Sequence, residues 1–260
     1  AYVNGFKLKN VTIEKTHAWA ISTERVLNAD ISNISLNDPG GWQIIDGKKQ
    51  YFENRDGIDL RDGCKNFRIN NISGVTGDDF IALSTLGVNS ENQEGGSLNS
   101  TMVTSRKWHG EEDNTERIFI TNINCKTPQF GVAIRANDMA SINNVYLNGV
   151  FYEGGRNQTI LVGDSLFFQY DRASHTKNGQ LLLISGRSSY GRESQPGKIN
   201  NIHAMNIFGV GGSLININAA IANCSFTNGI CTGKDDQIIL YKIDKSKTTD
   251  IVSQNLIKMQ

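Results

Sequence analysis

The segment spanning residues 54–86 reads NRDGIDLRDGCKNFRINNISGVTGDDFIALSTL, and its two halves resemble each other. Residues 56–60 (DGIDL) precede residues 79–83 (DFIAL) by 23 positions. Each half places an acidic residue directly before a short apolar run. A repeat with this period is typical of solenoids, in which each unit forms one coil and stacks on the next. The segment therefore predicts two consecutive coils.

Similar runs of alternating apolar residues recur along the whole chain. The longer ones are residues 6–13, 26–36, 67–72, 118–123, 142–150, 199–207 and 214–226, and shorter ones are residues 18–22, 57–60, 80–83, 131–134 and 180–184. Each is strand-length and bounded by Gly, Asn or Asp, which tolerate the left-handed backbone of turns. A β-sandwich or propeller also has many short strands, but its strands alternate in direction and need no similarity between consecutive coils. We therefore predict an all-β, single-stranded right-handed parallel β-helix, a solenoid with few helices.

The prediction is a single parallel β-helix domain over residues 1–260, with a long loop insertion at about residues 87–117. That insertion lacks periodicity and is rich in Gly, Ser, Asn and acidic residues, with Trp108 within it. Loops of this length are usually functional or mobile. It is interpreted either as a surface insertion or as one wall of a binding groove.

Composition excludes several kinds of partner. The 26 basic residues balance the 26 acidic ones, so no net charge attracts nucleic acid or an anionic membrane surface. No apolar stretch approaches the roughly 20 residues that a membrane span needs. The four cysteines form no CxxC pair and have no histidine at zinc-ligand spacing, so we expect neither a metal site nor a cofactor. The oligomeric state is not indicated.

Three aspartates are the strongest candidates for chemistry. On consecutive coils, Asp56 and Asp79 would stack at the strand spacing of about 4.8 Å, with Asp78 beside them. Like charges this close oppose ionisation and raise at least one pKa. Glycoside hydrolysis needs such a set, with one carboxyl protonated and another ionised. The alternatives are turn caps, a solvated ladder or calcium ligands. Asp59 and Asp62 are predicted to be turn residues.

The same segment resembles the polygalacturonase family of glycoside hydrolases, within the pectin-lyase-like β-helix superfamily. That family carries Asn-Thr-Asp-Gly-Ile-Asp, followed about one coil later by Gly-Asp-Asp; residues 54–59 (NRDGID) and 77–79 (GDD) are similar to these motifs. Residues 16–21 (THAWAI) are similar to its Ser-Pro-x-Trp-x-Ile. Two further motifs are missing, because Phe130 replaces the family's His and no Arg-Ile-Lys follows.

The resemblance implies cleavage of a pectin-like plant or bacterial polysaccharide with inversion. It implies that Asp78 is the general acid, while Asp56 and Asp79 hold and deprotonate the attacking water. It also implies a secreted or periplasmic protein. The predicted substrate contacts are Arg55, Trp108, which would stack on a sugar ring, Gln129, Arg135 and Arg187. Two alternatives remain: a polysaccharide lyase that uses calcium and an arginine base, and a non-catalytic glycan-binding or structural β-helix.

Overall fold

The structure is a computed structural model. It describes residues 3–45, 47–52, 55–85, 110–136, 140–154, 160–162, 165–167, 179–186, 198–210, 213–232 and 238–259.

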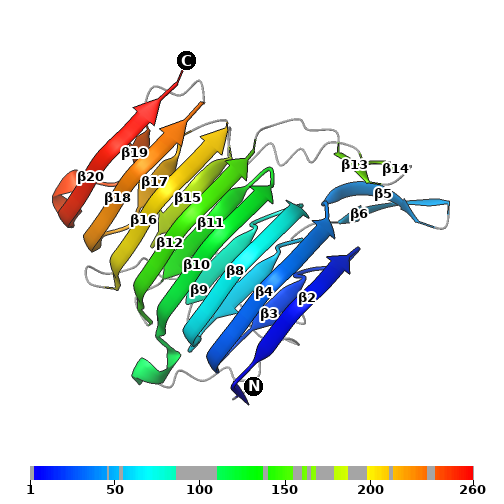
Figure 1. The fold of residues 1–260 in the computed structure, drawn as a ribbon, viewed down its shortest axis with the longest axis horizontal. Coiled ribbons are helices and arrows are strands. Elements are labelled where there is room, and N and C mark those ends of the chain that lie inside the picture. The colour runs from blue at the N-terminus through cyan, green and yellow to red at the C-terminus, as the bar shows by residue number, and fades with distance from the viewer. Residues whose placement is uncertain are drawn as a thin grey trace.

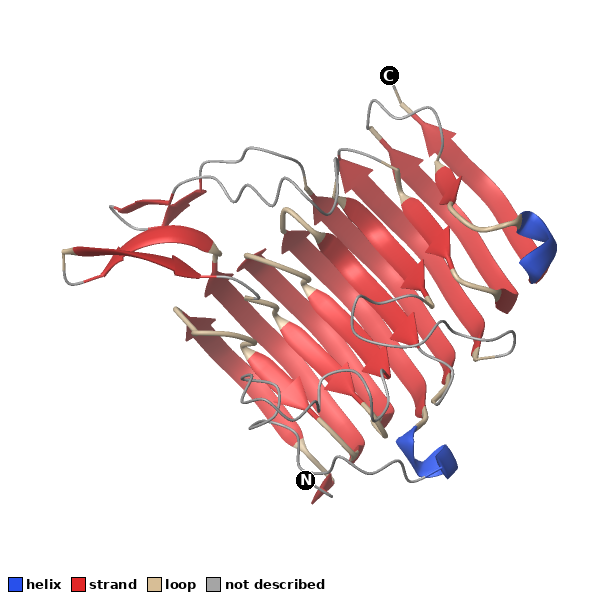
Figure 2. Cartoon of the chain, turned by 180° about the vertical axis from the view of Figure 1, so that it is seen from behind, coloured by secondary structure: helices blue, strands red, loops and turns tan. Residues whose placement is uncertain are grey.

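Two parallel sheets form the body of the molecule (Figure 1). The nine-stranded sheet contains β1 (Val3–Asn4), β2 (Lys7–Glu14), β4 (Val26–Asp38), β8 (Lys65–Thr76), β10 (Thr115–Lys126), β12 (Ile142–Glu153), β16 (Ile199–Val210), β18 (Ile221–Cys231) and β20 (Thr248–Lys258). The seven-stranded sheet contains β3 (Ile21–Thr23), β7 (Ile58–Arg61), β9 (Ile81–Thr85), β11 (Phe130–Ala136), β15 (Gln180–Ser185), β17 (Ile215–Asn218) and β19 (Ile239–Tyr241). The strands lie in chain order within each sheet, and the chain passes from one sheet to the other in each coil (Figure 2). The predicted all-β parallel β-helix is confirmed.

Four short strands lie outside these sheets. They form two antiparallel pairs, β5 (Gly41–Ile45) with β6 (Lys48–Phe52) and β13 (Ile160–Val162) with β14 (Ser165–Phe167). Helical structure in the described part of the chain is limited to two 3-10 turns, η1 (Gly110–Asp113) and η2 (Lys245–Lys247).

The core lies between the two sheets and is built from columns of apolar side chains. In one column Ile31, Ile69 and Ile120 occupy equivalent positions on adjacent strands, and each is fully buried or nearly so. The seven-stranded sheet contributes Ile58 and Leu60 on its inner side, both with no exposed surface. Because the residues of one column come from different coils, burial of each apolar run depends on its neighbours.

The nine-stranded sheet bends at two columns of residues with positive φ. The first column is Gly5, Asn28, Asn66, Arg117, Asn144, Asn201, Asn223 and Asp250, and the second is Asn10, Asn33, Asn71, Asn122, Gly149, Asn206, Asn228 and Asn255. In each coil the two positions are five residues apart. Amides also bond along a column: Asn33 Nδ2 donates to Asn10 Oδ1 at 2.8 Å, and Asn71 Nδ2 to Asn33 Oδ1 at 2.9 Å. Asparagine suits these bends because its short polar side chain tolerates left-handed backbone.

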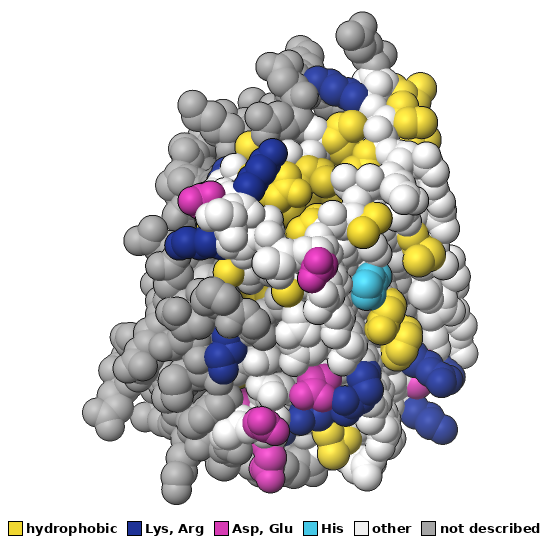
Figure 3. Space-filling model, turned by 90° about the vertical axis from the view of Figure 1, so that its left-hand side faces the viewer, with side chains coloured by type: hydrophobic (Ala, Val, Ile, Leu, Met, Phe, Trp, Pro, Cys, Tyr) yellow, Lys and Arg dark blue, Asp and Glu magenta, His cyan; other side chains and the backbone are white. Residues whose placement is uncertain are grey.

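Aromatic side chains also stack on the outer surface of the nine-stranded sheet. Phe119 lies 5.1 Å from Tyr146 between ring centroids, and Tyr146 lies 5.2 Å from His203. A second stack joins Phe151 and Phe208 at 5.0 Å. Phe119 and Phe151 are exposed. Figure 3 shows one face of the molecule on which hydrophobic side chains reach the surface in patches between charged ones.

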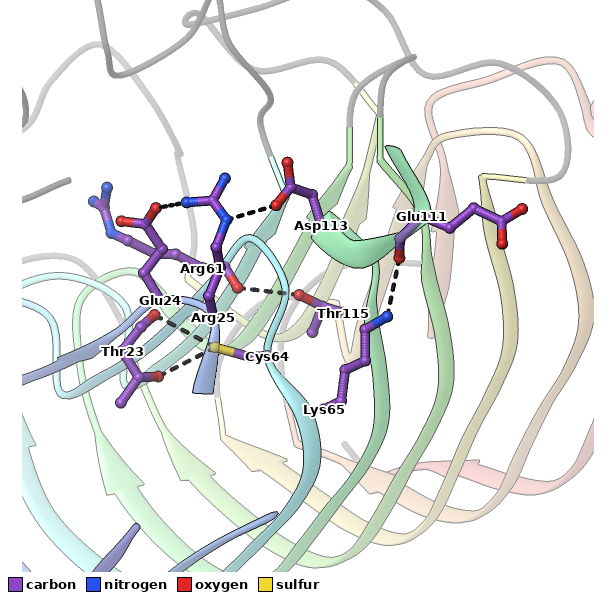
Figure 4. Close-up of polar contacts among 9 residues, drawn as sticks. All are labelled: Thr23, Glu24, Arg25, Arg61, Cys64, Lys65, Glu111, Asp113 and Thr115. Carbon is purple, nitrogen blue, oxygen red and sulfur yellow. Dashed lines mark hydrogen bonds and ion pairs between the residues drawn. The ribbon is translucent and has the colours of Figure 1, made fainter. Parts of the chain in front are cut away.

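An ion-pair cluster anchors η1 to the neighbouring coils (Figure 4). Arg25 Nε donates to Asp113 Oδ1 at 2.7 Å and Nη1 to Glu24 Oε1, and Lys65 Nζ donates to the carbonyl of Glu111 at 2.9 Å. Burial lowers the pKa of Arg25, but the hydrogen bond and charge of Asp113 and the charge of Glu24 raise it overall. These contacts hold the end of the predicted insertion. Its last residues form η1 and the start of β10. The rest of the insertion lies outside the described residues.

One predicted run was wrong in its bounds. Residues 214–226 were predicted as one strand-length run, but they form β17 and the first half of β18, which belong to different sheets. Ala219 and Ala220, both buried, lie at the bend between them. Because the apolar residues continue through this bend, periodicity alone does not reveal it.

Candidate active site

Asp56 and Asp79 occupy equivalent positions on adjacent coils, each two residues before a strand of the seven-stranded sheet. The register pairs Ile58 with Ile81, and Gly57 N donates to the carbonyl of Asp79 at 2.9 Å. The predicted stacking of these two aspartates is therefore confirmed.

Aromatic residues flank the two aspartates in the same column. Trp19 is equivalent to Asp56 one coil earlier, because Ile21 pairs with Ile58 and Ala20 N donates to the Asp56 carbonyl. Phe130 follows Asp79 one coil later, and the Phe80 N–H donates to its carbonyl at 2.9 Å. Gln180 is the next member. The candidate column thus reads Trp19, Asp56, Asp79, Phe130 and Gln180.

Asp78 lies beside this column in a turn that is fixed at several points. Its N–H donates to the carbonyl of Arg55 at 3.1 Å. Its carbonyl accepts from Thr76 Oγ1 at 2.9 Å and from Thr127 Oγ1 of the next coil. Its carboxylate Oδ1 accepts from the N–H of Asp79 at 3.1 Å. These contacts hold the Asp78 side chain next to Asp79.

Burial and mutual repulsion act together on the aspartates. Asp56, Asp78 and Asp79 are 9%, 7% and 2% exposed. Burial, and then the charges of Asp59, Asp78 and Asp79, raise the pKa of Asp56 well above its usual value, while Arg135 opposes the shift. In the described part of the chain, Oδ1 of Asp56 and Oδ1 of Asp79 have no hydrogen-bond partner. Asp56 therefore keeps its proton to higher pH than an exposed aspartate.

Arg135 on β11 is the cation of the site. Its Nη1 donates to Asp79 Oδ2 at 2.5 Å, and its guanidinium carbon lies 5.7 Å from the centroid of the Phe130 ring. Burial lowers the pKa of Arg135, but the charge and hydrogen bond of Asp79, and the charges of Asp56 and Asp78, raise it overall. Arg135 was predicted to contact substrate, and the structure places it on Asp79.

Asp59 is a member of the site that the sequence prediction missed. It was expected in a turn, but it lies within β7 and is 3% exposed. Its charge is the first of those that raise the pKa of Asp56. The alternation of Ile58, Asp59 and Leu60 was the available signal, because both apolar neighbours face the core. Asp62 does lie in a turn, as predicted.

Arg55 and Gln129 are held by the fold. The Arg55 side chain is 1% exposed; its Nη1 lies 3.4 Å from Asp38 Oδ1 and donates to the Pro39 carbonyl at 2.8 Å. Substrate binding by Arg55 does not fit this placement. Gln129 is buried, and its carbonyl accepts from the hydroxyl of Tyr152 at 2.9 Å.

The other two predicted contacts, Trp108 and Arg187, lie outside the described residues. Within the described ranges, no group of three or more His, Cys, Asp or Glu side chains is arranged to hold a metal ion. No helix in that part of the chain is long and apolar enough to cross a membrane. Comparison of the chain with protein-family models, curated proteins and solved structures finds no match.

Proposed function

We propose that the protein is a glycoside hydrolase that cleaves a pectin-like polysaccharide by aspartate acid and base catalysis. The observation that carries the proposal is the stacking of Asp56 on Asp79, with Asp78 held beside them and all three buried. Close carboxylates are costly for a fold to bury. They are also the groups that glycosidic bond cleavage requires.

The site favours two different protonation states, which acid and base catalysis needs. Burial and neighbouring carboxylates raise the pKa of Asp56, so this residue is suited to hold a proton. Asp79 pairs with Arg135 at 2.5 Å, and a charge-assisted bond of this kind favours an ionised carboxylate. One carboxyl would protonate the leaving oxygen while another activates water.

One of the flanking aromatic residues, Trp19, offers a place for a sugar ring. Trp19 and Phe130 lie on either side of the two aspartates in the column. Aromatic side chains present apolar surface against which the C–H groups of a pyranose ring can pack. A glycan that runs across the coils would thus have an apolar contact at Trp19, which is partly exposed, whereas Phe130 is 7% exposed and packs with Ala133 and Leu183.

Arg135 favours the hydrolase over the lyase alternative. A lyase of the expected kind needs an arginine that accepts a proton, but the charges of Asp79, Asp56 and Asp78 raise the pKa of Arg135. A guanidinium stabilised in this way is a poor proton acceptor. It is better suited to hold Asp79.

The test is a screen of pectic, rhamnose-containing and galactan-type polysaccharides with product analysis, comparing the parent with Asp79→Asn. General acid and base groups contribute about 10²- to 10⁴-fold, so the variant should lose activity on this scale while its circular dichroism spectrum is unchanged. Asp30→Asn is the matched control, because Asp30 lies on the nine-stranded sheet and pairs with Lys9. Full activity of Asp79→Asn would rule out the proposed mechanism.

The same screen separates the alternatives. A lyase would give products with a new double bond that absorbs in the near ultraviolet, and chelation of divalent cations would abolish its activity. A non-catalytic β-helix would bind oligosaccharides from the panel without cleaving any of them.

A further inference from the structure

Asp56 and Asp79 are nearly equivalent in their local surroundings. Each precedes a strand of the seven-stranded sheet by two residues, and the carbonyl of each accepts from the neighbouring coil at 2.9 Å, from Ala20 N and Gly57 N. Both side chains are buried, and both have an Oδ1 without a partner among the described residues. Backbone position therefore does not explain how two stacked carboxyls would divide acid and base roles.

Arg135 breaks this symmetry. Its Nη1 contacts Asp79 Oδ2 at 2.5 Å, and its side chain is 22% exposed while that of Asp79 is 3% exposed. The register pairs Arg135 with Ser84 on β9 and with Ser185 on β15. Serine side chains carry no charge. Across β9, β11 and β15, this column thus provides one long cationic side chain.

The ring of Phe130 directs the guanidinium toward Asp79. Phe130 belongs to the same strand as Arg135 and is the next residue after Asp79 in the candidate column. The guanidinium carbon lies 5.7 Å from the ring centroid, within cation–π range. In this position the Arg135 side chain reaches Asp79, which lies one coil earlier in the chain. Asp56 lies one coil earlier than Asp79. The equivalent arginine on β7, Arg61, lies over Trp19 at 4.3 Å.

We infer that Arg135 is a positioning residue that decides which of the two stacked aspartates carries the proton. It holds Asp79 in the ionised form, so that the proton resides on Asp56. This inference rests on the proposed function, and it makes Asp56 the proton donor and Asp79 the group that activates water. It differs from the assignment that the sequence resemblance implies, in which Asp78 is the acid.

Four charged groups face Asp56 in this arrangement. Asp59 lies on its own strand, Asp78 and Asp79 on the next coil, and Arg135 on the coil after that. The three carboxylates favour protonation of Asp56, and Arg135 opposes it. Tyr152 is a buried neighbour of Asp79. Its pKa is raised well above the usual value, chiefly by burial, with contributions from Cys125 and Asp79. It therefore stays neutral.

Loss of the guanidinium should let the pair share its proton. Two coupled carboxyls then titrate as a unit, without a fixed donor and acceptor. The Arg135→Gln variant keeps a side chain of similar length and removes the charge. The Arg135→Lys variant keeps the charge but loses the planar geometry that pairs with a carboxylate, so it should recover part of the parent behaviour.

The primary test is a carbon-13 NMR titration of the aspartate carboxyl groups, which needs no activity. In the parent, the carboxyl that titrates at raised pH should disappear in Asp56→Asn and persist in Asp79→Asn. In Arg135→Gln, the signal at raised pH should belong to the coupled pair, so that neither Asp56→Asn nor Asp79→Asn alone removes it from this background. Arg68→Gln, on the exposed face of the nine-stranded sheet, should leave the signals of the acidic pair unchanged. A raised-pH signal that still disappears with Asp56→Asn alone in the Arg135→Gln background would overturn the inference.

Kinetics on a cleaved polysaccharide gives the second readout. The acid limb of the kcat/KM profile should move to higher pH in Arg135→Gln, with KM little changed. A raised KM with an unmoved profile would instead mean that Arg135 contacts substrate, which overturns the inference.

The proposed function and the role of Arg135 can fail separately. Hydrolysis by a protein whose raised-pH signal still depends on Asp56 alone in the Arg135→Gln background leaves the function standing without the role of Arg135. The expected titration in a protein that cleaves no glycan would support the control of the proton by Arg135 and would rule out the proposed function.

Discussion

The outer faces of the two sheets are built on opposite rules. On the nine-stranded sheet, like residues stack on like, as in the asparagine columns and in the stack of Phe119, Tyr146 and His203. On the seven-stranded sheet, the column that contains Asp56 and Asp79 changes residue type along its length. The nine-stranded sheet repeats the same type of residue from coil to coil. The column on the seven-stranded sheet instead places aromatic, acidic and amide side chains next to one another.

This difference separates stability from chemistry. Several asparagine amides bond to the next asparagine of their column, as Asn33 does to Asn10 and Asn71 to Asn33, so the repeated residue satisfies part of its own hydrogen bonding. In the mixed column, buried carboxylate oxygens of Asp56 and Asp79 are left without partners in the described ranges. Violations of local consistency tend to concentrate at functional sites. This is consistent with the proposal that the column of Asp56 and Asp79 is a functional site.

The largest effect should come from the buried pair that supports the turn before Asp56. Arg55 and Asp38 are 1% and 0% exposed, and removal of one partner leaves a buried charge uncompensated. Arg55→Met should therefore lower the free energy of unfolding by about 3–5 kcal/mol, measured by denaturant titration. Lys9→Met, which breaks the exposed pair with Asp30, should cost less than about 1 kcal/mol. Equal losses in the two variants would show that Asp38 is not charged when Arg55 is present.

An intermediate effect should come from the asparagine columns. Asn71 has a φ of 56°, and left-handed backbone costs a residue with a Cβ about 1–2 kcal/mol. Asn71→Ala should lose about this amount in denaturant unfolding, together with the bond to Asn33. Asn71→Gly loses the same bond but tolerates the backbone, so it should be the more stable variant. If alanine is tolerated as well as glycine, strain does not select asparagine here.

The smallest effect, and one of opposite sign, should come from the acidic cluster. The folded chain raises the pKa of Asp56 above the ordinary value of 3.8, so it binds this proton more tightly than the unfolded chain does. The resulting stabilisation is complete below the unfolded pKa and is lost as pH rises through the folded pKa. The Asp56→Asn side chain has no proton to lose, so the variant should not lose this stabilisation as pH rises. It should match the parent in acid and be more stable by about 0.5–1 kcal/mol at pH 8, within the range of common stabilising substitutions.

Chemical unfolding at several pH values checks this prediction. A difference between Asp56→Asn and the parent that does not change with pH would contradict it, as would a variant that is less stable at pH 8. Asp62→Asn is a suitable control, because Asp62 lies in the turn after β7.

The sequence was sufficient for the fold and for the central pairing. The repeat of DGIDL and DFIAL gave the register of Asp56 and Asp79, because one coil returns equivalent residues to adjacent strands. The long asparagine columns were also visible in principle, since Asn66 and Asn71, and Asn201 and Asn206, are each five residues apart.

The tertiary partners of charged residues were not predictable in this way. Arg55 lies within the segment NRDGID, but its side chain turns to Asp38, the last residue of β4. Arg135 reaches Asp79 across 56 residues of sequence. Both partnerships depend on coil lengths, which residue spacing alone does not reveal. Asp59 was misjudged for a different reason, because aspartate is more common in turns than within strands.

The paired left-handed bends have a consequence for how this chain could be lengthened or redesigned. Asn206 and Asn228 are separated by 22 residues, whereas Gly149 and Asn206, which are also neighbours in the same column, are separated by 57. Extra residues are therefore accommodated between the bends without a change in strand register. A foreign peptide inserted at such a junction, outside the five-residue frame, would be displayed beside the next coil while the solenoid continues undisturbed.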